Sequence, residues 1–428
     1  MPCWLENGPM RLLLLLLLTL LPATPHAAEF EIFQAGYQPL KLAWMSDAEG
    51  VDAADLKLIH GIVANDLQSS KSFVVLSPYS YLADITQVRH GVDYGDWRII
   101  GTDILALAHL KRLGNHWNAD IEVHDPFRNK LLSKTSLSYS SESLRPLGHA
   151  IANHIYRAAT GTPGFFDTHI LYVSKHGRTA DLVYMDQDKA NRQLVGKNFT
   201  LLLSPDLSPD NNLLALNTYV GNHPRLETFN LSTGQRSTFG DFKGLNSTPA
   251  WSPDGRYIAA TLSYTGYTQI HLYDTHTGKW RQLTHHKGID TSPSWSPDGE
   301  NIVFTSNRNG SPQIYKIRLS DSHIERVSHQ GPYNTSAIWS PAGDRIAYIA
   351  LKNWQYALAT MRPDGTDVHY LVTGGQVDTP AWAPNGQMLL FSRTVSGVRR
   401  LYRVPSWGGK AEALTGPLED ASDPVWSR

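Results

Sequence analysis

In the C-terminal two-thirds of the chain, apolar and polar residues alternate in short runs separated by turn signals, a pattern that predicts β-strands rather than helices. One stretch shows the pattern clearly. Residues 301–306 are rich in β-branched and aromatic side chains, and residues 313–317 alternate as a half-buried strand does. A shorter strand is expected before them at 291–295, and another after them around 325–327. Four short strands without a helix predict one antiparallel blade of a β-propeller.

The same unit recurs with a fixed period. The clearest copies contain Trp-Ser-Pro-Asp-Gly, and the six equivalent positions are Leu207, Trp251, Trp295, Trp339, Trp382 and Trp426. The steps between them are 44, 44, 44, 43 and 44 residues. A period in the range of about 40 to 50 residues marks a repeated structural unit.

The two ends of the repeat region complement each other. Residues 170–173, 182–185 and 192–195 read as the second, third and fourth strands of a blade that has no first strand before them. Residues 424–427 read as a first strand with nothing after it. We therefore expect a six-bladed propeller closed by the C-terminal strand. An open solenoid is the alternative, although it would need capping repeats at its ends.

The repeated Asp and Trp residues have a structural explanation. Pro and Gly preset the backbone of a tight turn and Asp bonds its own backbone, so the repeated Asp is expected to close a turn. The tryptophans are expected to anchor adjacent blades. The 18 histidines show no His-Glu-x-x-His spacing and Cys3 is the single cysteine, so we expect neither a metal nor a cofactor. Because no Gly-x-Ser-x-Gly motif and no glycine-rich phosphate loop occur, we expect no enzyme activity.

The first 160 residues have a different pattern. Arg11, the apolar run 12–18 and small residues up to Ala28 read as a secretory signal peptide over 1–28, too short in its apolar part to span a bilayer. Without it the chain has no cysteine and relies on burial rather than disulfides.

An α/β domain is expected over residues 29–160, followed by the propeller over 161–428. Helical periodicity covers 53–67, with Asp52 as its expected N-cap, and 143–159. Four strands are expected between the helices, at 73–76, 104–110, 120–124 and 134–139. This order predicts a small two-layer α/β domain, and Thr160-Gly161-Thr162-Pro163-Gly164 is the expected linker.

The charge balance excludes one class of partner. Lys and Arg number 38 and Asp and Glu number 39, which gives a net charge of −1, and no basic stripe occurs. Nucleic acid is therefore disfavoured as a ligand.

Several sequence motifs lie outside the repeats. These motifs are Gly61-Ile62-Val63-Ala64-Asn65-Asp66-Leu67, Trp97 with Gly101-Thr102-Asp103-Ile104, Gly148-His149-Ala150, and residues 160–166. Together with the repeats they cover nearly all of the chain that would follow the signal peptide. With the signal peptide and the propeller repeats, this arrangement resembles the TolB family, the periplasmic component of Tol-Pal systems.

The resemblance implies a periplasmic binding protein. Members of the family bind the outer-membrane lipoprotein Pal over the propeller mouth and the inner-membrane protein TolA through the mature N-terminal segment. They support outer-membrane constriction during cell division and outer-membrane integrity, and some bacteriocins use the same mouth. The resemblance thus implies Pal, TolA, other envelope proteins and bacteriocins as partners of a monomer without a transmembrane segment.

Two groups of residues are expected to carry partner binding. Because each first strand lines the channel, the polar residues just before it should lie at the channel rim, where Pal would dock: Asn246, Asp290, Asn334, Asp378 and Asp420. Asn and Asp also favour turns, which is the structural explanation for the same residues. The arm 29–37 alternates as a strand that could add to a sheet edge of TolA, through Glu29, Phe30, Ile32, Phe33 and Tyr37.

Two other classes of function stay open at this point. One is a propeller that binds a small molecule in its channel. The other is a propeller that acts with a separately encoded peptidase.

Overall fold

The computed structural model describes residues 37–140 and 143–427, which belong to one compact unit. The expected signal peptide (1–28) and the arm residues Glu29, Phe30, Ile32 and Phe33 lie outside the described residues. Among the described residues, no helix has the length and apolar character that crossing a membrane requires.

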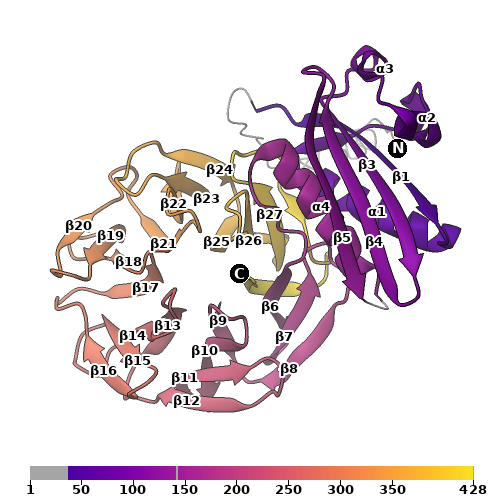
Figure 1. Cartoon of the computed structure of the whole chain (residues 1–428). Coiled ribbons are helices and arrows are strands. Elements are labelled where there is room, and N and C mark those ends of the chain that lie inside the picture. Colours follow the sequence, from indigo (N-terminus) through magenta and orange to yellow (C-terminus); the bar gives the residue numbers. More distant parts are fainter. Residues whose placement is uncertain (1–36, 141–142, 428) are drawn as a thin grey trace, which may run out of the picture. The chain divides into compact units, whose positions relative to one another are not determined.

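The first domain is built on a five-stranded sheet with the order β2-β1-β3-β4-β5 (Figure 1). β1 pairs in parallel with β2 and β3, whereas β3, β4 and β5 form an antiparallel meander. The five strands are β1 (Leu40–Glu49), β2 (Phe73–Val75), β3 (Ile104–Leu113), β4 (His116–Asp125) and β5 (Lys130–Ser140).

Helices cover both faces of this sheet. The long helices α1 (Ala53–Ser69) and α4 (Arg145–Thr160) pack on one face, where Ile59, Val63 and Ile151 are fully buried. The short helices α2 (Ile85–His90) and α3 (Tyr94–Ile99), preceded by the turn η1 (Pro78–Ser80), cover the other face, where Trp97 is buried.

The expected α/β class is confirmed, but the two expected layers are three, because α2 and α3, which were not predicted, cover the second face of the sheet. Two further differences are of detail. The central strand β1 was not predicted, because its run Leu42–Met45 is buried on both faces and shows no alternation. Asp52 does precede α1, but its side chain makes no capping hydrogen bond. The capping box is at Asp84, whose carboxylate accepts from the backbone of Gln87 at the start of α2.

The second domain is a six-bladed propeller of four-stranded antiparallel sheets, as expected (Figure 1). Blade 1 is β29-β6-β7-β8, and blades 2 to 6 follow in chain order from β9 to β28. The innermost strands are β29 (Asp420–Trp426), β9 (Leu202–Leu207), β13 (Asn246–Trp251), β17 (Asp290–Trp295), β21 (Asn334–Trp339) and β25 (Gln376–Trp382). The second strands are β6 (His169–His176), β10 (Leu213–Val220), β14 (Tyr257–Leu262), β18 (Asn301–Ser306), β22 (Ile346–Lys352) and β26 (Met388–Val395).

The outer half of each blade is less regular. The third strands are β7 (Thr179–Asp186), β11 (His223–Asn230), β15 (Gln269–Asp274), β19 (Gln313–Arg318), β23 (Gln355–Met361) and β27 (Val398–Pro405). The fourth strands are β8 (Gln193–Phe199), β12 (Arg236–Gly240), β16 (Lys279–Gln282), β20 (Ile324–Arg326), β24 (His369–Thr373) and β28 (Glu412–Ala413).

The C-terminal strand closes the ring. β29 pairs with β6, with Ser422 opposite Val173 and Val425 opposite Leu171, and so completes blade 1. The indole of Trp426 donates to Oγ1 of Thr168 at 2.8 Å, which fastens the end of the chain to the start of the propeller.

Each propeller face has its own set of connections. At one face, which we call the rim face, the chain enters each innermost strand, and hairpins join each second strand to the third. At the opposite face lie the Pro-Asp-Gly type turns and the connections from third to fourth strands.

Candidate functional site

A cavity of about 580 Å³ lies among the innermost strands of all six blades. Its wall is formed by the repeated segment itself, including the tryptophans at positions 251, 295, 339, 382 and 426. The repeat therefore serves two structural purposes, because the same residues hold the blades and line the channel.

A ring of small polar side chains faces this cavity. Each innermost strand contains a β-bulge, and one non-glycine residue at each bulge has a left-handed backbone with φ between 44° and 54°. These six residues are Ser204, Thr248, Ser292, Ser336, Thr379 and Asp423. The channel wall thus offers five hydroxyl groups and one carboxylate.

The repeated Asp residues act as turn residues, as the sequence predicts. Oδ1 of Asp254 accepts from the hydroxyl of Ser252 at 2.5 Å and from the backbone of Arg256 at 3.0 Å. Asp298 makes the equivalent bonds with Ser296 and Glu300. The hydrogen bonds from the serine hydroxyls contribute most, followed by those from the backbone, and together they hold the pKa of both carboxyl groups below the ordinary value.

The tryptophans join neighbouring blades. The indole of Trp295 donates to the carbonyl of Ala250 in the preceding blade at 3.0 Å, and that of Trp382 donates to Ile338 at 3.3 Å. The expected role as interblade anchors is confirmed for these two residues.

Of the five expected rim residues, three have no exposed surface. Asn246, Asp290 and Asn334 are each 0 % exposed and begin an innermost strand. Both oxygens of Asp290 accept from the guanidinium of Arg308, at 3.2 and 3.0 Å, and this guanidinium also lies over the ring of Tyr315. Asp290 therefore holds a buried ion pair.

The two asparagines hold the loops that lead into their strands. Asn246 donates to the carbonyl of Phe242 at 2.7 Å and accepts from its backbone N–H at 3.1 Å. Asn334 donates to the carbonyl of Gln330 at 2.8 Å and to the side chain of Gln313 at 2.7 Å. For these three residues the geometry supports a role in shaping the rim rather than direct contact with a partner, because their side chains are enclosed.

The remaining two residues are accessible. Asp378 is exposed beside the channel residue Thr379, and Asp420 is half-buried with a carboxylate oxygen 3.6 Å from the guanidinium of Arg399. Desolvation by the surrounding wall, and then the charge of Asp423, raise the pKa of Asp378. Partner binding by Asp378 and Asp420 stays a prediction.

The rim face carries a second feature that the sequence reasoning missed. Of the nine large apolar side chains that are exposed in the described part of the propeller, eight lie on this face: Val220, Tyr264, Tyr267, Ile289, Trp354, Tyr356, Val395 and Leu418. Their sequence signal is an apolar residue at a position predicted to be a hairpin or a connection. Concentrated exposed apolar surface marks interaction sites in soluble proteins.

Of the expected arm residues, the structure describes Tyr37. Its ring stacks on that of Trp407, in the connection between β27 and β28, with centroids 4.1 Å apart. Burial raises the pKa of Tyr37, which fits a ring held against the protein. The base of the arm is thus held at the face opposite the rim face.

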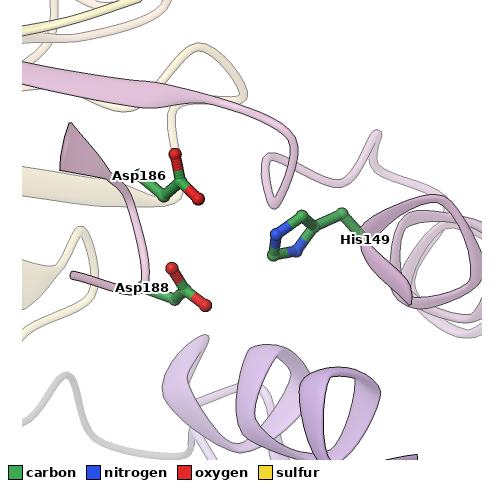
Figure 2. Close-up of side chains that lie close together, drawn as sticks. All are labelled: His149, Asp186 and Asp188. Atoms are coloured by element: carbon green, nitrogen blue, oxygen red, sulfur yellow. The ribbon is translucent and has the colours of Figure 1, made fainter. Parts of the chain in front are cut away.

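A polar cluster joins the two domains (Figure 2). The side chains of His149 on α4 and of Asp186 and Asp188 near the end of β7 point toward one another, with one potential ligand atom of each within 4.8 Å of the others. Such a set has the chemistry of a cation site. However, Nη2 of Arg145 lies 3.3 Å from Nε2 of His149, 3.1 Å from Asp186 and 2.6 Å from Asp188. The guanidinium supplies the positive charge there, so the cluster acts as an interdomain ion network.

Two of the motifs singled out in the sequence meet beside this network. Asp66 and His149 are buried, and a carboxylate oxygen lies 2.6 Å from Nδ1 of the imidazole. Gly148 lies against Ile62 so closely that a Cβ would stand 2.8 Å from Cγ2 of that isoleucine. The glycine lets α1 and α4 approach, and the Asp–His pair fixes their register.

The fold and this geometry define a class of protein: a β-propeller with a fused N-terminal α/β domain and an apolar rim face. The family model described as the TolB beta propeller domain matches residues 156–428, and that of the TolB amino-terminal domain matches residues 28–132. The chain belongs to the TolB family.

Known relatives are similar over different shares of the chain. The crystal structure of TolB from Acinetobacter baumannii has a TM-score of 0.83 and 25% sequence identity, over 93% of this chain and 98% of that one. The Tol-Pal system protein TolB of Paramagnetospirillum magneticum is 33% identical over 223 residues, 50% of each chain. The chain therefore matches half the length of this curated relative. A nidogen/laminin complex, at 11% identity and a TM-score of 0.51, shares the fold alone.

Proposed function

We propose that this protein is the periplasmic binding component of a Tol-Pal system, which connects the outer-membrane lipoprotein Pal with the inner-membrane protein TolA. In this role it supports outer-membrane constriction during division and outer-membrane integrity. The proposal rests on family membership and on one observation: eight of nine exposed large apolar side chains of the described propeller lie on the rim face. A one-sided apolar surface of this kind fits a protein partner.

The domain arrangement is compatible with two separate binding regions. The polar contacts between the domains involve Asp186, Gln187, Asp188 and Glu412, which lie toward the face opposite the rim. This arrangement leaves the rim face available for binding Pal and the arm that precedes Tyr37 available for binding TolA.

Binding of Pal is tested with its soluble domain and purified protein in isothermal titration calorimetry. We expect a saturable complex of one Pal domain per chain, weakened by Leu418→Asp on the rim face. Leu194→Asp is the matched control, because Leu194 is an exposed apolar residue on the outer strand β8. Absence of binding by the wild-type protein would refute the proposed partner.

Binding of TolA is tested by deleting residues 29–36 and retaining Tyr37. We expect loss of TolA binding with unchanged affinity for Pal, since the deletion leaves the described propeller intact. If TolA binds the shortened protein as well as the full chain, the arm is not the site. N-terminal sequencing of the protein recovered from the periplasm tests the expected signal peptide over 1–28 at the same time.

The channel offers one observation in favour of a second function. A cavity of about 580 Å³ with a ring of hydroxyl groups is within the range of about 300–1,000 Å³ of small-molecule sites. A thermal-shift screen of periplasmic metabolites, followed by Ser204→Ala in the channel wall, separates this function from protein binding. A ligand-dependent stabilisation that this substitution removes would favour the small-molecule function.

A further inference from the structure

Four hairpins on the rim face have two-residue turns, and one of them departs from the common chemistry. The turns are Gly177-Arg178, Gly221-Asn222, Asn353-Trp354 and Ser396-Gly397. Two-residue hairpins favour turns with positive φ, which glycine adopts without steric cost. Three of the four turns contain a glycine, whereas Asn353 and Trp354 adopt φ of 49° and 63° without one.

No contact with other described residues compensates Trp354 for its unfavourable backbone conformation. The left-handed conformation costs a residue with a Cβ roughly 1–2 kcal/mol. The side chain is nevertheless 91 % exposed, and its indole makes no ring contact or hydrogen bond with other described residues. A bulky apolar side chain kept at an unfavourable position in solvent points to a function outside the folded chain.

The surroundings of Trp354 fit a protein interface. Tyr356, two residues further on, is exposed and packs edge-on against Tyr333 with centroids 6.2 Å apart. The hairpin of the next blade contributes the exposed Val395. Tryptophan is the residue type most enriched among the energetic centres of protein interfaces.

The charges on the same face indicate the character of the partner. Three exposed basic residues of its connections form neither an ion pair nor a cation–π contact with other described residues: Arg178, Lys243 and Lys287. Several carboxylates nearby already have a basic partner. Asp241 lies 3.1 Å from Arg225, and Glu419 lies 2.7 Å from Arg192. The charge available to a partner is therefore predominantly positive.

We propose that Trp354 is the anchor by which a folded partner protein docks on the rim face, and that this partner presents an apolar pocket for the indole within an acidic surround. The inference rests on the proposed function, since it names the anchor and the surface chemistry for the partner assigned to this face. It adds a prediction that family membership does not make, because it depends on this hairpin and these lysines.

The first experiment separates binding from stability. In Trp354→Gly the left-handed backbone is relieved, so we expect an equal or higher melting temperature. The affinity for the soluble Pal domain should fall roughly tenfold or more, as for a central interface tryptophan. Ser322→Gly is the matched control, because Ser322 is an exposed left-handed residue (φ 57°) at the opposite face. The control should show the same direction in stability and unchanged affinity.

The second experiment tests the charge of the partner. Lys287→Glu on the rim face should weaken binding and reduce its dependence on salt, whereas Lys279→Glu should do neither. Both lysines are exposed; Lys279 begins β16 at the opposite face, and Lys287 lies on the rim face in the connection that follows β16, which makes them a matched pair.

The outcomes are distinct. If wild-type protein does not bind the Pal domain, the proposed function is wrong and the anchor with it. If the wild type binds and Trp354→Gly binds equally well, the anchor alone is wrong. If Trp354→Gly instead converts a wild-type dimer into a monomer in analytical ultracentrifugation, the occupant of this face is a second copy of the chain and the acidic partner is refuted.

Discussion

One carboxylate oxygen of Asp66 lies 2.6 Å from Nδ1 of His149, and the other accepts a hydrogen bond from Gln187 at 3.0 Å. Asp66 is on α1, His149 is on α4, and Gln187 follows β7 of the propeller. A single buried carboxylate thus links both long helices of the first domain with blade 1. Because breaking a buried pair leaves an uncompensated charge, Asp66→Ala should lower the free energy of unfolding by roughly 3–5 kcal/mol.

This pair predicts a pH dependence of stability. Burial and the charge of Arg145 oppose the charged imidazolium of His149, but the hydrogen bond and charge of Asp66, with the charge of Asp188, outweigh them and raise the pKa of His149. Folding therefore favours the protonated form. Its contribution is complete below the unfolded pKa of about 6.5 and is lost as the pH rises through the folded pKa.

The measurement is urea unfolding of the wild type and of His149→Gln between about pH 5.5 and 8.5. We expect the stability difference between the two proteins to shrink as the pH rises. Parallel pH profiles would show that His149 has the same pKa in both states and would contradict this assignment.

Asp290 and Asp378, both expected at the rim from the sequence, should respond oppositely to loss of charge. Asp290→Ala leaves the partly buried Arg308 without its carboxylate partner and should cost about 3 kcal/mol. Desolvation and Asp423 raise the pKa of Asp378, so its carboxylate opposes folding at neutral pH. Asp378→Asn should therefore keep or increase stability.

Thermal unfolding at pH 7 compares the two variants. The double substitution Asp290→Ala with Arg308→Met should recover part of the stability lost in Asp290→Ala, because no buried charge is left unpaired. A normal melting temperature for Asp290→Ala would mean that the ion pair is not a structural requirement of the loop.

The repeat made the propeller fold predictable from the sequence, whereas the surroundings of single residues could not be predicted. Six copies of one segment average out local ambiguity, and the missing first strand before residue 170 left one closure for the C-terminal strand. β1 was missed because a central strand buried on both faces has no period of two. The location of Asp290 at the start of a strand was also predictable, but its partner Arg308 comes from the next connection and becomes visible only in three dimensions.

The contacts of the interdomain network could likewise not be predicted from the sequence. Asp66 and His149 stood out only as parts of motifs, since no spacing rule joins residues 83 positions apart. Trp354 could have been found earlier, because an Asn-Trp pair between two alternating runs lacks the glycine of a common hairpin.

Two helical glycines on facing helices should have opposite responses to alanine. Gly148→Ala places a Cβ 2.8 Å from Ile62 on α1 and should destabilise the protein by about 1–3 kcal/mol. Gly61→Ala meets no atom within 4 Å and should stabilise it by roughly 0.5–1 kcal/mol through helix propensity.

Chemical denaturation of the two variants measures both the expected decrease and the expected increase in the free energy of unfolding. The cost of Gly148→Ala should be smaller in an Ile62→Ala background, since that substitution removes Cγ2 of Ile62, the closest atom. Equal effects of the two alanines would show that close packing of α1 and α4 does not decide the choice of glycine.

Closure of the propeller by β29 makes the stability of the ring depend on its last residues. Trp426 is buried, bonds to Thr168 and packs edge-on against Phe165 with centroids 5.6 Å apart. Trp426→Ala should therefore cost about 3–5 kcal/mol, as expected for a large core side chain. Deletion of residues 420–428 removes the whole innermost strand of blade 1 and exposes the edge of β6, so it should lower the melting temperature further and promote aggregation.

A peptide of residues 420–428 added to the shortened protein tests whether the strand acts through pairing. If β29 closes the ring by its contacts with β6, the peptide should raise the melting temperature of the shortened protein in a concentration-dependent manner. A peptide with Trp426→Ala should raise it less, because the bond to Thr168 and the packing on Phe165 are absent. A shortened protein as stable as the full chain would contradict closure as a source of stability, since the ring would then hold without its last strand.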